Sequence, residues 1–375
     1  MKWTKKIFTK ELAAVYVSFV LLILLLMIPT GYEEAVLYQK GDHCAAEVLA
    51  TNEDSIIDTG LVRSGEQTCT VRLLGGKFKG QETQAVNMLN GSLENDKLFA
   101  VGDKAQVLVS YSDDEILSVN MIDHYRITHE IWLAAIFILV LVFVAGKTGI
   151  RAILSFVITV LMIWKVLVPA YLNGYNAVLV GMIITGILTV IIISLVYGFE
   201  RRTLAAVCGA MAGLIVTAVT GIIFTDVMQI HGAIMPYSES LLYSGYSELN
   251  LTEIFMASIF IGASGAVMDL SVDITSAVWE VIGKKPDIGW REAARSGMNV
   301  GRAAMGTMTT TLLLAYSGGF VTLLMVFMAQ GTPVYNILNY KYVASEIMDT
   351  VVGSMGLVSV APLTAIFAGY LLTRK

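Results

Sequence analysis

The chain has 375 residues, of which 56% are hydrophobic and only 15% charged, and its formal net charge is −5. Soluble domains carry about a quarter charged residues, so this composition excludes an ordinary soluble protein. It predicts an α-helical polytopic membrane protein surrounded by a lipid bilayer, and we expect no nucleic-acid partner.

Apolar runs predict eight membrane-spanning helices, because about 20 apolar residues suffice for one helical crossing. Short polar links separate most of the runs. We expect three parts: a cytoplasmic N-terminus and first anchor over residues 1–30, an extracytoplasmic β-rich domain over 31–127, and a seven-helix transmembrane domain over 128–375. The expected spans lie near residues 12–29, 131–147, 152–172, 177–198, 203–225, 254–282, 303–328 and 349–372.

The basic residues of the helical part are distributed unevenly between the two sets of alternating links. Fifteen lie on one side of the predicted layout, whereas the opposite short links hold only Lys341. The positive-inside rule therefore predicts that both termini are cytoplasmic and that 31–127 is outside. The fifteen are Lys2, Lys5, Lys6, Lys10, Lys147, Arg151, Arg201, Arg202, Lys284, Lys285, Arg291, Arg295, Arg302, Arg374 and Lys375.

The first apolar run has two interpretations. Its basic start and apolar core are typical of a signal peptide, but no small-x-small cleavage site follows the run and its core is long. We favour an uncleaved anchor. Either interpretation leaves residues 31–127 outside the cytoplasm.

Segment 31–127 is acidic, with 16 Asp and Glu residues against 8 Lys and Arg residues. Alternating apolar residues and turn signals at Gly75-Gly76, Asn90-Gly91 and Gly102-Asp103 predict five short strands. Five strands in a segment of this length suit a small barrel or sandwich, and an OB-like barrel is one candidate topology. The strands are expected at Glu47–Ala50, Gln67–Leu74, Gln81–Met88, Ala105–Tyr111 and Ile116–Ile122.

Cys44 and Cys69 both lie in this outer segment, Cys69 within a predicted strand and Cys44 shortly before one. An extracytoplasmic pair can form a disulfide, and two buried free thiols are the alternative. The sequence does not decide between them. The chain has no Cys-x-x-Cys and no Cys/His cluster, so we expect no cofactor, and the presence of a metal is left open.

The sixth span holds three carboxylates, on Asp269, Asp273 and Glu280. At 100° per residue they fall on one face of one helix. Counting from the ends of the span places Asp269 near the middle of the membrane and Glu280 near the cytoplasmic end. Carboxylates at such depth usually face a bundle interior or a wet cavity, which favours a cation or proton site at Asp269 and Asp273.

The seventh span carries polar residues that share a face with its single arginine. We expect Arg302 to lie at the depth of Glu280 and to form a gating ion pair with it. The residues expected to line a path beside the carboxylates are Asn299, Gly306, Thr307 and Thr310. The alternative is structural pairing of polar groups between helices, with close packing at Gly297 and Gly301.

Glu346 and Asp349 precede the eighth apolar run. They could form a vestibule, but we interpret them as acidic residues at the start of the last helix, where they favour the positive end of the helix dipole.

An enzyme is not expected. Ser264, between Gly262 and Gly265, resembles the serine motif of rhomboid proteases, but all four histidines precede it, so the required later histidine is absent. The chain also lacks His-Glu-x-x-His and a phosphate-binding glycine loop.

Three segments resemble the YibE/F family of bacterial membrane proteins: Gly265–Val281, Ser296–Tyr316 and Ala361–Ala365. The layout of an anchor, an outer domain and seven spans is also similar. In the family's pattern an aspartate often follows the arginine and an asparagine often sits in the threonine run, whereas Ala303 and Thr310 stand here. The resemblance implies a bacterial plasma membrane and a companion paralogue, and no catalytic or binding residue carries over.

We therefore expect an eight-span permease for a small solute or ion, coupled to protons or a cation through Asp269 and Asp273. The rival hypothesis is a non-transporting membrane subunit whose extracytoplasmic domain binds a protein. A paralogous membrane subunit or a second copy of the chain is the expected membrane partner.

Overall fold

A computed structural model of the chain describes residues 2–32 and 41–374. Residues 33–40 of the predicted outer segment, and Lys375 among the basic residues, lie outside the described residues. The structure divides into two compact units: residues 31–144 form one, and residues 1–30 together with 145–375 form the other. The predicted boundary near 127 therefore moves to 144, because the helix that follows the strands groups with them.

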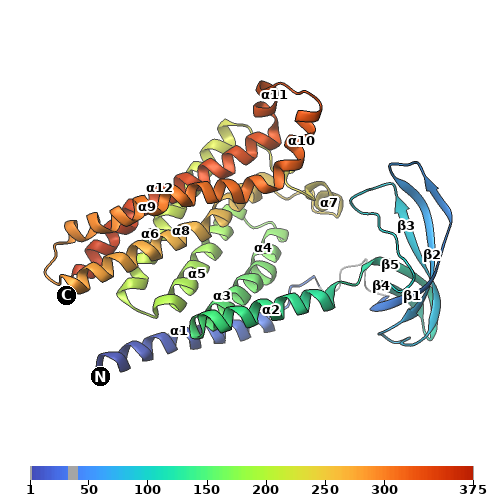
Figure 1. The fold of residues 1–375 in the computed structure, drawn as a ribbon, viewed down its shortest axis with the longest axis horizontal. Coiled ribbons are helices and arrows are strands. Elements are labelled where there is room, and N and C mark those ends of the chain that lie inside the picture. The colour runs from blue at the N-terminus through green and yellow to red at the C-terminus, as the bar shows by residue number, and fades with distance from the viewer. Residues whose placement is uncertain (1, 33–40, 375) are drawn as a thin grey trace. The chain divides into compact units, whose positions relative to one another are not determined.

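The first unit is a closed barrel of five strands in the order β1-β2-β3-β5-β4 (Figure 1). Only the β3–β5 pair is parallel; β1–β2, β2–β3, β1–β4 and β4–β5 are antiparallel. The five predicted strands are thus confirmed, and the first is much longer than expected. The strands are β1 (Gly41–Asp58), β2 (Arg63–Leu73), β3 (Glu82–Asn90), β4 (Lys104–Ser112) and β5 (Glu115–His124), and helix α2 (Ile127–Ala145) follows them.

Alternation of side chains builds the barrel core. On β2, Cys69, Val71 and Leu73 are buried while the residues between them are not, because successive side chains of a strand point to opposite faces. A buried amide network fixes the β3–β4 connection: Gln67 donates to Phe99 O at 2.9 Å and Asn87 donates to Lys97 O at 2.6 Å.

Cys44 and Cys69 are free thiols in this barrel, so the disulfide alternative is wrong in the structure. The strand register gives the reason. Cys69 pairs with Thr51, which lies seven residues along β1 from Cys44. At about 3.3 Å per residue that separation is roughly 20 Å, whereas a disulfide needs Cα atoms within about 7 Å.

We expect both thiols to resist alkylation in the folded protein and to react after denaturation. Burial is the main reason, since it raises the pKa of Cys69 to about 11 and also raises that of Cys44, and the thiolate is the reactive form. Mass spectrometry after iodoacetamide, with and without denaturant and without reductant, checks this. A Cys44–Cys69 cross-linked peptide would contradict it.

The second unit is helical, and each expected span coincides with a helix. Across both units, seven helical segments of the described chain are long and apolar enough to cross a bilayer, and α1 adds a shorter apolar stretch, Leu12–Met27. Side chains cap two of the helices: Asn176 accepts from Leu179 N, and Asn250 accepts from Glu253 N. The long helices are α1 (Lys2–Met27), α3 (Lys147–Met162), which continues through a π-helical turn (Ile163–Leu167) into α4 (Val168–Leu172), α5 (Ala177–Tyr197), α6 (Arg201–Val227), α8 (Leu251–Lys284), α9 (Trp290–Ser317), which continues into α10 (Val321–Ala329), and α12 (Lys341–Thr373).

Two short helices, α7 (Ser238–Tyr243) and α11 (Val334–Asn339), lie in the connections between these spans. The centre of the helical unit is α8, which packs against α5, α6, α9 and α12 (Figure 1). Its buried core includes Val267, Leu270 and Ile274, packed with residues of α6 and α12.

Small residues allow these helices to approach closely. A Cβ added at Gly209 of α6 would lie 2.8 Å from Thr364 Cα of α12, and one added at Gly213 would lie 2.8 Å from Val360 Cβ. Gly297 and Gly301 of α9 pack in the same way against Val278 and Ile274 of α8. In a membrane the hydrophobic effect does not drive helices together, because lipid is as apolar as they are. Close van der Waals packing of this kind therefore stabilises helix pairs there.

Candidate functional site

The predicted carboxylate face of α8 exists, and it is exposed in this chain. Asp269, Asp273 and Glu280 all lie on it. Its two neighbours are α5, whose Tyr197 hydroxyl is 2.6 Å from Ser276 Oγ, and α9, whose Tyr316 hydroxyl lies against Gly262. The face therefore forms an open strip between α5 and α9 rather than an enclosed path. Four small residues are also exposed on it: Ser258, Gly262, Gly265 and Ser276.

The expected gate pair between Glu280 and Arg302 is not formed. Glu280 pairs with Lys284 of its own helix at 3.0 Å, and both side chains are exposed. The predicted depth of Arg302 was wrong because α9 begins at Trp290, thirteen residues earlier than the expected span. Arg302 therefore lies about 18 Å along the helix, at the level of Asp273 and not of Glu280.

The expected path-lining residues share one exposed side of α9. Asn299, Gly306, Thr307 and Thr310 are all exposed, whereas the side of α9 that packs on α8 and α12 holds Gly297, Gly301 and Leu312. Thr307 donates its hydroxyl to Ala304 O at 3.0 Å. Within the described residues, no hydrogen bond joins this side to Asp269 or Asp273, so the path stays a prediction.

A different pair of carboxylates is partly buried within the bundle, with one oxygen of each enclosed. Glu346 and Asp349 lie on consecutive turns of α12, and one oxygen of each is buried without a hydrogen-bond partner in the described chain. The hydroxyl of Tyr316, on α9, is buried and unpartnered in the same way, and its ring lies beside Gly353, one turn along α12 from Asp349. Three polar oxygens from two helices thus share one enclosed region.

Glycines on α8 and α12 make room for the Tyr316 ring at this cluster. A Cβ at Gly262 would lie 2.6 Å from Tyr316 Oη, and one at Gly353 would lie 3.9 Å from its ring. Three helices therefore determine where the phenol oxygen stands. The ring is rigid, so its position depends on the absence of a side chain at Gly262.

Our interpretation of Glu346 and Asp349 as acidic residues in the first turn of the last helix is wrong. α12 begins at Lys341, so Glu346 is its sixth residue and Asp349 its ninth. At 1.5 Å per residue both lie about 8–12 Å inside the helix, beyond the reach of its terminal dipole. Their Glu-x-x-Asp spacing puts both carboxylates on one helix face, and this signal favours the vestibule alternative over the helix start.

At the other end of α8, a cation holds α5 and α6 against it. The guanidinium of Arg202 lies 5.0 Å from the ring of Tyr197 and 5.1 Å from that of Trp279, and it pairs with Glu200 at 2.9 Å. Cation–π contacts of this kind contribute about 0.5–2 kcal/mol each. The arrangement stabilises the helix ends and leaves no free charge for binding.

Lys165, inside the span α3–α4, is also satisfied. Its ammonium donates to Leu26 O at 3.1 Å and to Ile28 O at 2.8 Å, at the end of α1. These carbonyls have no intrahelical partner, so the lysine caps the end of α1.

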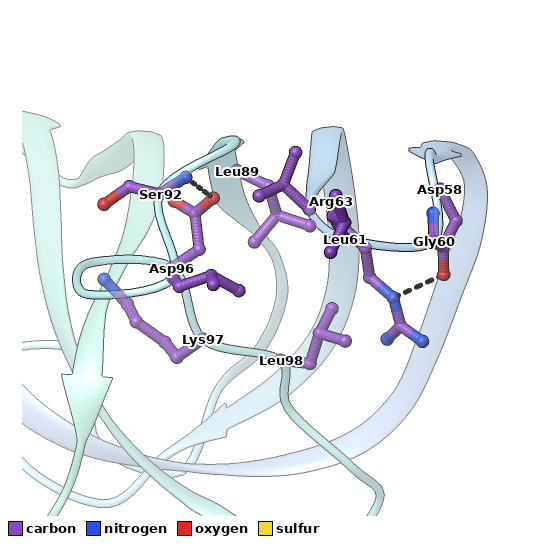
Figure 2. A pocket seen from close by; sticks show the side chains of 11 residues that line it. Asp58, Gly60, Leu61, Arg63, Leu89, Ser92, Asp96, Lys97 and Leu98 are labelled. Atoms are coloured by element: carbon purple, nitrogen blue, oxygen red, sulfur yellow. Dashed lines mark hydrogen bonds and ion pairs between the residues drawn. The ribbon is translucent and has the colours of Figure 1, made fainter. Parts of the chain in front are cut away.

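The barrel carries a separate pocket of about 360 Å³ between the β1–β2 turn and the β3–β4 connection (Figure 2). Leu61 and Leu93 on its rim are 84% and 81% exposed. Asp58 pairs with Arg63 at 2.8 Å, and hydrogen bonds from Gly60 N–H and from Arg63 hold the pKa of Asp58 below its ordinary value. The pocket thus combines exposed leucines with an ion pair already formed within the chain.

No group of three or more His, Cys, Asp or Glu side chains in the described part of the chain could hold a metal ion. The two carboxylates and the phenol at the α9–α12 contact remain the enclosed oxygen cluster that this unit offers to a cation or proton.

A family model described as YibE/F-like protein matches residues 133–374. The match begins inside α2 and includes every later helix, with Asp269, Asp273, Arg302, Tyr316, Glu346 and Asp349. No curated protein and no solved structure matches the chain.

Proposed function

We propose that this chain, which belongs to the YibE/F-like family, is a permease for a small solute or ion that is coupled to protons or to a cation. It would lie in the bacterial plasma membrane with both termini in the cytoplasm and the barrel outside. The uneven distribution of Lys and Arg supports this orientation.

The observation that carries the proposal is the enclosed cluster of Tyr316, Glu346 and Asp349, with three buried oxygens that have no partner in the described chain. Native proteins pair nearly all buried polar groups, because an unpaired one costs about 1–3 kcal/mol and a charged one more. Two adjacent carboxylates add mutual repulsion. Function explains why such a cluster is kept inside an apolar bundle.

Two kinds of ligand would relieve this cost. A proton on either carboxylate removes one charge and supplies a donor for the neighbouring oxygens. A metal cation would find carboxylate and phenol oxygens, and hard cations prefer oxygen ligands. Protons and metal cations are both used as coupling ions by transporters. Two carboxylates and a phenol can bind either. We therefore assign the binding of the coupling ion to Glu346 and Asp349, and no longer to Asp269 and Asp273.

The cluster also has neighbours that could move. Tyr316 is followed closely by Gly318-Gly319, where α9 gives way to a short 3-10 turn (Gly318–Phe320) before α10. A break of this kind lets one half of a span change its position while the other stays packed. Such a change would uncover the carboxylates on one side, as alternating access requires.

Reconstituted liposomes that enclose a pH-sensitive dye test the proposal. We expect the wild-type protein to collapse an imposed proton or cation gradient when a transported solute from a panel of small ions is added. Glu346→Gln and Asp349→Asn should reduce the rate at least tenfold. Asp287→Asn, an exposed carboxylate in the α8–α9 link, is the matched control and should retain the rate. Equal rates in all four proteins would contradict the proposed site.

The exposed leucines beside the barrel pocket favour a second candidate, a membrane subunit that binds a protein through its outer domain. Exposed apolar residues around a pocket are typical of binding surfaces. The same liposomes separate the two candidates, because a subunit of this kind shows no flux with any solute of the panel. Leu61→Ser with Leu93→Ser should leave flux unchanged if the permease acts alone.

A further inference from the structure

Three ionisable side chains stand on the exposed surface of the helical unit, far from the helix ends. Asp269 and Asp273 project from α8, and Arg302 projects from α9; all three are exposed. Within residues 2–32 and 41–374, none of them has a hydrogen bond or an ion pair. In a bilayer this surface faces lipid, where charges are costly unless they are paired or hydrated.

The three charges lie at the same depth. Gly301 of α9 packs against Ile274 of α8: a Cβ at Gly301 would be 2.9 Å from the Ile274 side chain. Arg302 follows Gly301 in the chain, and Asp273 precedes Ile274. Arg302 and Asp273 are therefore each one residue, or about 100° around the helix axis, from the contact between Gly301 and Ile274. They turn away from the contact and remain unpaired although they belong to neighbouring helices.

The surface between them suits a close helix contact. Asn299, Gly306 and Thr310 lie within about 80° of Arg302 on α9 at 100° per residue, and all are exposed. Gly265 lies on the Asp269 face of α8, and a Cβ added there would meet nothing within 4 Å. Small residues at these places let another helix approach.

We propose that a second copy of this chain covers this surface, so that Arg302 of each copy pairs with Asp269 and Asp273 of the other. Rotation about a two-fold axis parallel to the helices leaves the position of each residue along that axis unchanged. Arg302 of one copy therefore stands at the same height as Asp273 of the other. The contact is isologous: the same acidic and basic positions meet twice. The sides of α9 that carry Asn299, Gly306 and Thr310 then meet at the axis.

Charge complementarity identifies the occupant. The surface carries opposite charges at one depth, and a second copy supplies their complement without any further component. A lipid headgroup stays at the membrane surface, and an apolar helix would leave the charges unpaired. This inference does not depend on the proposed transport, because it uses none of Tyr316, Glu346 and Asp349.

Cysteine cross-linking in native membranes tests the proposal. One tagged copy carries Asp273→Cys and a second, with a different tag, carries Arg302→Cys, both in a background with the three native cysteines replaced by alanine. Copper phenanthroline is the oxidant. In such a mixed pair, one of the two symmetric bridges becomes a disulfide and the other stays intact.

We expect a band that carries both tags as the main product. The control replaces Asp273→Cys by Ile215→Cys, an exposed position of α6 at similar depth, and should give at least tenfold less of that band. A yield no greater than this control, or a cross-link to another membrane protein instead, overturns the proposal.

Native mass spectrometry of the detergent-solubilised protein without cysteine substitutions gives an independent test. The wild type should be a dimer, Arg302→Asp should be a monomer, and Arg302→Asp with Asp273→Arg should be a dimer again. A monomeric wild type overturns the proposal. So does a dimer in all three proteins, because its contact would not depend on these charges.

Discussion

Gly209→Ala should strongly lower the thermal unfolding midpoint of the protein. The added Cβ would meet the Thr364 hydroxyl and would lie 2.7 Å from Thr364 Cβ and 2.8 Å from Thr364 Cα. These atoms belong to the backbone and first side-chain carbon of a long helix, so relief requires α6 and α12 to separate. Overpacking of this kind costs about 1–3 kcal/mol.

The measurement is the unfolding midpoint of the detergent-purified protein, followed by the fluorescence of a thiol-reactive dye or of tryptophan. Gly283→Ala is the matched control: it lies in the last turn of α8, and an added Cβ there meets nothing within 4 Å. The control should unfold at the wild-type temperature or slightly above, because alanine favours helix more than glycine. Equal midpoints for the two variants would contradict the close α6–α12 contact.

Gly262→Ala should reduce transport about tenfold while every charged residue stays in place. The added Cβ would lie 2.6 Å from the hydroxyl oxygen of Tyr316, and the rigid ring has to shift as a whole. A displacement of about 1 Å in a binding group is enough to lower rates by one to two orders of magnitude. The phenol oxygen would then leave its present position on the side of the cluster that faces α8.

The liposome assay measures this effect, with Gly283→Ala as the control. Gly283 lies in the last turn of α8, and an added Cβ there meets no atom within 4 Å. We expect Gly283→Ala to transport at the wild-type rate. Normal transport by Gly262→Ala would mean that the position of Tyr316 has no part in the site.

Apolar runs were sufficient to predict the helices, because a long apolar segment pairs its own backbone groups when it forms a helix. The strands of the barrel followed from alternation and glycine turns, such as Asn90-Gly91, where Gly91 has a φ of 77°. The extent of β1 did not follow, because its second half, from Thr51 to Asp58, is polar and mostly exposed. Pairing with β2, which no local pattern reveals, extends that strand.

The candidate site was harder to predict, for two physical reasons. Helices extend past their apolar runs, so the polar starts of α9 and α12 were assigned to links, and Arg302, Glu346 and Asp349 were placed too near the ends of their helices. Which residues of two different helices come close together also depends on how the helices pack. Asp269 and Asp273 share a face of one helix, and this was predictable. The position of the Tyr316 ring near Asp349 was not, because it depends on the absence of side chains at Gly262 and Gly353.

The most direct test of the enclosed site is the thermal unfolding midpoint across a panel of Na⁺, K⁺, Mg²⁺, Ca²⁺ and pH values. A ligand that binds only the folded state stabilises it by about 2.7 kcal/mol at 100 times its Kd. We predict that one cation, or acidification, raises the midpoint of the wild type and of Asp287→Asn, and that Glu346→Gln and Asp349→Asn abolish this rise. An equal response of Asp349→Asn and wild type would contradict a coupling site at Tyr316, Glu346 and Asp349.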